Sequence, residues 1–85
     1  MTSRKEVYDA IDTEREYQNA LGPDRTENHG EGHSVGDYIT MLQAYQTKLV
    51  SAWTDSPGDI LALHVMRKIA GIAVRCMEDH GALKR

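Results

Sequence analysis

Three serines in this chain are each followed, three residues later, by an acidic residue: Ser3/Glu6, Ser34/Asp37 and Ser56/Asp59. In such a capping box the serine oxygen accepts from the backbone N–H of the acidic residue, which reaches back to the serine N–H. Apolar residues recur every three or four positions after each pair, which is the spacing of a helix face. The sequence therefore predicts an all-α fold, a three-helix antiparallel unit in a single domain 1–85, with helices at 4–20, 35–53 and 57–80.

Glycine and proline residues mark the expected ends of these helices. Gly22-Pro23 stops the first helix, Pro57 occupies the favoured first position of the third, and Gly81 follows its end. Residues 22–33 contain three glycines and one proline and show no apolar periodicity, so we expect a loop there. A loop of this length in so small a domain is often functional or mobile.

The third predicted helix is apolar on most of its sides, which is typical of a buried helix. A chain of 85 residues buries only about 60–65% of its unfolded surface, so its own core is small. The single cysteine, Cys76, cannot form an intrachain disulfide, and we interpret it as a core residue. Two helices of the same chain cannot cover the third fully. We therefore predict a homo-oligomer, a dimer or higher, that assembles through residues 57–80, most simply about a two-fold axis.

The charge of the chain limits its partners. A net charge of −3 disfavours general binding to DNA or RNA. Residues 64–85 nevertheless hold five Lys or Arg against two acids, which indicates an anionic partner at this end. No apolar run approaches the roughly 18 residues of a membrane span, and residues 1–6 lack the apolar region of a signal peptide. We expect a cytoplasmic protein without a membrane partner.

A line of polar residues follows one face of the third predicted helix at steps of three and four residues. Lys68 and Arg75 are seven residues apart, or about 10 Å along a helix, which suits two phosphates or a phosphate and a carboxylate. Gly71 between them would let a ligand or another backbone come close. The alternative is a solvated outer face. The candidate ligand contacts on this helix are His64, Arg67, Lys68 and Arg75.

Further candidate ligand contacts come from the first two predicted helices. His33 and Ser34 stand at a helix N-terminus, where backbone N–H groups attract anions, although Asp37 favours a cap or a cation there. Tyr38 and Trp53 could stack on a base, but rings at helical spacing more often belong to a core. Arg15 and Tyr17 complete the candidate set.

Glu14 falls within the apolar face of the first predicted helix. A carboxylate in that place must be paired, bound to a metal, or at the rim of the face. Two interpretations remain: a salt bridge to the third helix at the edge of the face, or a polar site between helices. His29 and His33 flank Glu31, but a glycine-rich loop is a poor platform for zinc, which favours ordinary loop histidines.

Residues 11–18, 33–38 and 67–81 together resemble a group of small bacteriophage and prophage proteins of the MazG-like type. MazG proteins are all-helical, oligomeric nucleotide pyrophosphohydrolases that hold magnesium with a Glu-Glu-x-x-Glu motif and a later Glu-x-x-Asp. If this chain shares that chemistry, the resemblance implies that Glu14 and Asp37 bind Mg²⁺. The chain departs from the pattern in its second helix, where no acid follows Asp37 on the inward face, and in its third, where Met66 and Arg67 stand mid-helix.

The reduced acidic set matches a second class, the small helical phage proteins that bind nucleotide immune signals without cleaving them. Our leading prediction is a phage-type oligomer in the host cytoplasm that binds and sequesters a nucleotide or nucleotide-derived signal, with neither catalysis nor a cofactor. The first alternative is a Mg²⁺-dependent nucleoside triphosphate pyrophosphohydrolase. The second is a structural module or an inhibitor of a host protein.

Overall fold

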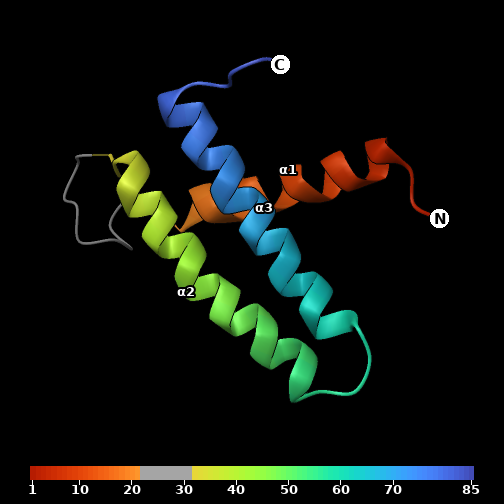
Figure 1. Ribbon diagram of the computed structural model, residues 1–85. Coiled ribbons are helices and arrows are strands. Elements are labelled where there is room, and N and C mark those ends of the chain that lie inside the picture. The colour runs from red at the N-terminus through yellow and green to blue at the C-terminus, as the bar shows by residue number, and fades with distance from the viewer. Residues whose placement is uncertain (22–31) are drawn as a thin grey trace.

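The chain forms three α-helices in the computed structural model, which describes residues 1–21 and 32–85. These are α1 (Arg4–Ala20), α2 (Val35–Thr54) and α3 (Ile60–His80), and the described residues contain no strand (Figure 1). The all-α prediction is confirmed, and α1 has the predicted bounds. Most of the predicted loop, residues 22–31, lies outside the described ranges. His29 and Glu31 lie there too.

The first two capping boxes form as the sequence predicts. Ser3 Oγ accepts from the Glu6 backbone N–H at 3.1 Å, and Glu6 Oε1 accepts from the Ser3 N–H at 3.2 Å. The corresponding distances at Ser34 and Asp37 are 3.0 and 2.9 Å. The hydrogen bonds from the backbone N–H and then the hydroxyl of Ser34 lower the pKa of Asp37 below its usual value. Each box thus satisfies two N–H groups that lack a partner within the helix.

The third capping box does not form, and the prediction of a helix from residue 57 is wrong. α3 begins at Ile60, and its cap residue Asp59 makes no side-chain hydrogen bond to the helix. Gly58 has a φ of 82°, a left-handed conformation that glycine adopts readily and that cannot belong to a right-handed helix. The Ser-Pro-Gly-Asp segment therefore forms a turn between α2 and α3.

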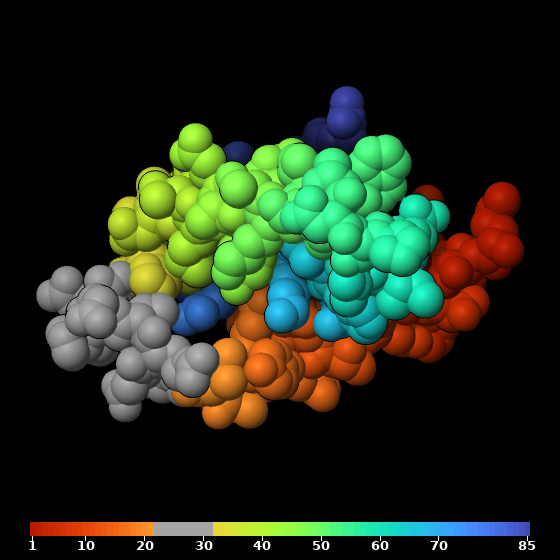
Figure 2. All heavy atoms as spheres, turned by 90° about the horizontal axis from the view of Figure 1, so that it is seen from below, coloured from red at the N-terminus to blue at the C-terminus, as the bar shows by residue number. Residues whose placement is uncertain are grey.

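α3 lies between the other two helices. It packs against both α2 and α1. Figure 1 shows α2 descending to the turn and α3 returning beside it, while α1 crosses behind α3 at a steep angle. Seen from below in Figure 2, α2 and α1 lie on opposite sides, and atoms of α3 form the floor of a hollow between them.

The core of this arrangement is small. Tyr38 of α2 and Ile72 of α3 are the two hydrophobic residues that are fully buried among the described residues. The radius of gyration is 13.9 Å, whereas a compact chain of this length has about 12 Å. A single copy thus leaves much apolar surface exposed.

None of the helices in the described part of the chain is long and apolar enough to cross a membrane.

Candidate functional site

The joint between α1 and α3 is built around a glycine. A Cβ atom at Gly71 would lie 2.8 Å from Glu14 Cγ and 2.8 Å from Gln18 Nε2, closer than real Cβ contacts. The absence of a side chain at this position therefore lets α1 come close to α3. At this joint Glu14 and Arg15, neighbours in α1, are the two charged residues that are buried in the described part of the chain.

Glu14 is paired with a cation of α3. Its Oε1 accepts from Arg67 Nε at 3.0 Å, and its Oε2 accepts from Gln18 Nε2 at 3.3 Å. Arg67 Nη1 also contacts His64 Nδ1 at 2.7 Å. The salt bridge from Glu14 to the third helix is thus confirmed. The carboxylate is buried rather than placed at the edge, because Gly71 lets α3 cover it.

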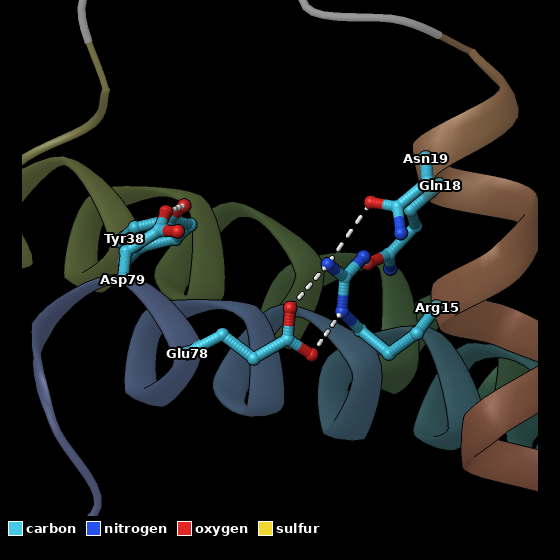
Figure 3. Close-up of polar contacts among 6 residues, drawn as sticks. All are labelled: Arg15, Gln18, Asn19, Tyr38, Glu78 and Asp79. Atoms are coloured by element: carbon cyan, nitrogen blue, oxygen red, sulfur yellow. Dashed lines mark hydrogen bonds and ion pairs between the residues drawn. The ribbon is translucent and has the colours of Figure 1, made fainter.

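Arg15 holds the far end of α3 through a two-pronged ion pair (Figure 3). Its Nε and Nη2 donate to the two carboxylate oxygens of Glu78 at 3.0 and 2.7 Å, and its remaining donors reach Gln18 and Asn19 at 3.0 Å each. This bidentate geometry is the strong form of an Arg–carboxylate interaction. The hydrogen bond to Glu78 raises the pKa of Arg15, and the same bond lowers the pKa of Glu78. Arg15, predicted as a ligand contact, serves here to join two helices.

Tyr38 makes the corresponding connection from α2. Its hydroxyl donates to the Asp79 carboxylate, and its ring is fully buried. Burial, and then the hydrogen bond to Asp79, raise the pKa of Tyr38 to about 12, so the phenol stays neutral at physiological pH. The consecutive acids Glu78 and Asp79 therefore hold two different helices, α1 through Arg15 and α2 through Tyr38, as Figure 3 shows.

Two histidines surround the Tyr38 ring edge-on. The ring centroids of His33 and His80 lie 5.4 and 6.1 Å from that of Tyr38. His80 Nε2 is 2.7 Å from the backbone carbonyl oxygen of His33, and His33 Nδ1 is 3.9 Å from Asp37 Oδ2. This packing connects the start of α2 with the end of α3. The enclosed Tyr38 ring presents no open face for a ligand.

Lys68 and Arg75 lie on the side of α3 between its two partner helices. Gly71 faces α1 and Asp79 faces α2, and both cations fall between these directions by helical spacing. Both are half-buried, and Arg75 lies 6.0 Å from the Tyr38 ring centroid. Among residues 1–21 and 32–85, neither cation has a carboxylate at salt-bridge distance. By helical spacing they therefore lie on the side of α3 between α1 and α2, without a carboxylate of the described residues at salt-bridge distance.

The remaining candidates are dispersed. Tyr17 and Trp53 are exposed on α1 and α2, and Ser34 is engaged in its cap. The suggested metal ligands are engaged too, Glu14 with Arg67 and Asp37 with Ser34. Within the described ranges no three His, Cys, Asp or Glu side chains form a group that could hold a metal ion. Cys76 is half-buried.

Sequence reasoning missed the functions of Glu78, Asp79 and His80 as residues that connect helices. One signal could have found them. Two adjacent acids at the end of a mostly apolar helix must point in directions about 100° apart, and a helix packed between two others offers each acid a different partner. The sequence interpretation assigned these residues only to the helix terminus.

The ion pair between Arg15 and Glu78 leads to a testable dependence on pH. Because the folded-state pKa of Glu78 is lowered, the pair stabilises the fold above the ordinary glutamate pKa and is lost as pH falls through the folded value. Glu78→Gln should cost about 1–2 kcal/mol at neutral pH, a value reduced for the 49% exposure of the Glu78 side chain. Urea unfolding at several pH values should show this difference shrinking below about pH 4.3. A difference that stays constant down to pH 3 would contradict the ion pair.

Comparison of the chain with models of known protein families, with curated proteins and with solved structures found no match.

Proposed function

We propose that this protein is a homo-oligomer that binds a nucleotide or nucleotide-derived signal and sequesters it without turnover. The observation that carries the proposal is the pair of half-buried cations, Lys68 and Arg75, which helical spacing places on the side of α3 between its contacts with α1 and α2. A ligand of the length of a nucleotide could place an anionic group, such as a phosphate, against each of the two cations.

The energetic argument compares four cations in the same region. Arg15 and Arg67 each have a carboxylate partner, Glu78 and Glu14, at 2.7 and 3.0 Å. Lys68 and Arg75 have lost part of their hydration and have no such partner among the described residues. Partly desolvated charge is unfavourable unless it is paired. A bound phosphate would offset that cost, and the seven-residue spacing matches two anionic groups about 10 Å apart.

Sequestration rather than hydrolysis is favoured by the state of the acids. Glu14 is buried against Arg67 and Gln18, and Asp37 is held in the Ser34 cap. Magnesium needs several oxygen ligands with open coordination positions for substrate. Binding a metal here would require both carboxylates to leave hydrogen bonds that stabilise the fold.

The proposed ligand site belongs to an oligomer assembled through α3. One copy buries two hydrophobic side chains fully within its described residues and leaves apolar side chains of all three helices exposed. We propose that helices of different copies also pack antiparallel to one another, so that the antiparallel packing expected from the sequence extends across the contact between copies.

Isothermal titration calorimetry with a panel of cyclic and linear nucleotides tests the proposal. At least one nucleotide should bind, and its affinity should fall with salt because phosphate is held by cations. The nucleoside with the same base but no phosphate is the matched control and should not bind. Addition of Mg²⁺ should release no pyrophosphate from a bound triphosphate.

Two outcomes would overturn this function. If no nucleotide of the panel binds, the site is not a nucleotide site. If Mg²⁺-dependent pyrophosphate release is observed and is lost in Glu14→Gln, the protein is a hydrolase. The ion pair of Glu14 with Arg67 would then not be present in the catalytically active conformation.

A further inference from the structure

One side of α3 carries an apolar stripe that neither α1 nor α2 covers. The stripe residues follow one another at steps of three, four, three and four, the spacing of the contact positions in paired helices. Leu63, Met66 and Met77 are 63%, 49% and 46% exposed, and the two alanines between them are half-buried. We call this set the α3 stripe: Leu63, Met66, Ala70, Ala73 and Met77.

The direction of the α3 stripe follows from the contacts on the other sides of the helix. Arg67 and Gly71 face α1, and Asp79 faces α2. By helical spacing the stripe is centred about 100° from the mean direction of Arg67 and Gly71 and about 160° from that of Asp79. It is therefore the third side of α3, separate from the side that carries Lys68 and Arg75.

The total exposed surface of one copy is large enough to contribute to an interface of standard size. The chain exposes 6796 Å², whereas a folded monomer of 9.5 kDa exposes about 5,000 Å². The excess exceeds the roughly 800 Å² that each partner contributes to a standard interface. A second copy of this chain provides a stripe of the same spacing and composition, as a two-fold interface requires.

We propose that α3 pairs with α3 of a second copy along this stripe, antiparallel and with the crossing point at Ala70 and Ala73. Small residues at a crossing allow close approach of the helices, and the larger Leu63, Met66 and Met77 pack on either side of it. An antiparallel arrangement also places the positive N-terminus of each helix beside the negative C-terminus of the other. The pairing specifies the oligomer of the proposed function. It needs no ligand and uses another side of α3 than Lys68 and Arg75, so the pairing and ligand binding can be tested separately.

Analytical ultracentrifugation of the full chain tests the contact. The wild type should sediment at twice the 9.5 kDa of one chain or a higher multiple, without any nucleotide. Ala70→Glu, which places a carboxylate at the crossing point of both copies, should shift the assembly to a lower mass. Thr47→Glu is the matched control. It adds the same charge at an exposed position of α2, two and a half turns after the buried Tyr38, and should leave the mass unchanged.

A wild type that is monomeric, or an Ala70→Glu assembly of unchanged mass, would overturn the pairing. If Ala70→Glu loses its helical circular dichroism together with its assembly, the variant is unfolded, and a distance measurement tests the pairing instead. Spin labels at Asp59→Cys, in a Cys76→Ser background, should lie about 30–40 Å apart in an antiparallel pair crossing at Ala70 and Ala73. Asp59 suits this purpose because its side chain makes no cap hydrogen bond. A separation under about 20 Å, or no defined separation, would contradict the antiparallel arrangement.

Discussion

Replacing Tyr38 with alanine is expected to lower the free energy of unfolding by about 3–5 kcal/mol, the range for removal of a buried aromatic ring. Tyr38 is the one side chain with no exposure among the described residues, and it contacts Asp79, His33 and His80 at the joint between α2 and α3. A small domain has a total stability of about 5–15 kcal/mol, so the variant should be partly or wholly unfolded. Urea unfolding followed by circular dichroism measures the change.

Tyr38→Phe separates the ring from its hydrogen bond. It keeps the buried ring and removes only the donor to Asp79, whose carboxylate is exposed enough for water to replace the phenol. We expect a loss of about 1 kcal/mol. If Tyr38→Ala costs no more than Tyr38→Phe, the ring is not the centre of the core.

The second large effect is expected at Gly71. Gly71→Val should cost about 2–3 kcal/mol, because its Cβ atom would lie 2.8 Å from Glu14 Cγ and α1 would have to move away. The better helix propensity of valine returns only a few tenths of a kcal/mol. Gly71→Val should increase the rate of hydrogen exchange more in α1 than in α2, because the ion pairs of Glu14 and Arg15 weaken together.

Gly36→Val is the matched control for this substitution. Gly36 lies in α2, and a Cβ atom there meets only Ser34 Oγ, at an ordinary 3.6 Å. Its effect should stay within about 0.5 kcal/mol, as for a surface position. Equal losses in the two variants would show that Gly71 has no special part in the approach of α1.

The helices could be predicted because their signals are local. The boxes at Ser3 and Ser34 depend on residues three positions apart, and both formed as predicted. The box at Ser56 has the same residue types but failed, since Gly58 adopts a positive φ in a turn that connects two packed helices.

The connections between helices could not be predicted in the same way. Arg15 and Glu78 are separated by 63 residues, and Tyr38 and Asp79 by 41, so no periodicity relates them. Helical spacing did place Arg67, Lys68 and Arg75 near one another on α3. It could not say which cation meets a carboxylate, because that depends on the position of α1. The structure pairs Arg67 with Glu14 and leaves Lys68 and Arg75 without a carboxylate among the described residues.

The most direct test of the proposed ligand site compares nucleotide affinity in three proteins by calorimetry: the wild type, Lys68→Gln/Arg75→Gln and Lys5→Gln. Lys5 is a surface cation of α1, 83% exposed, and its substitution removes a positive charge on a helix other than α3. The double variant should keep its helical circular dichroism and lose at least 100-fold in affinity, about 2.7 kcal/mol for two charged contacts. Lys5→Gln should bind as the wild type does. A double variant that binds the same nucleotide with unchanged affinity would contradict the account.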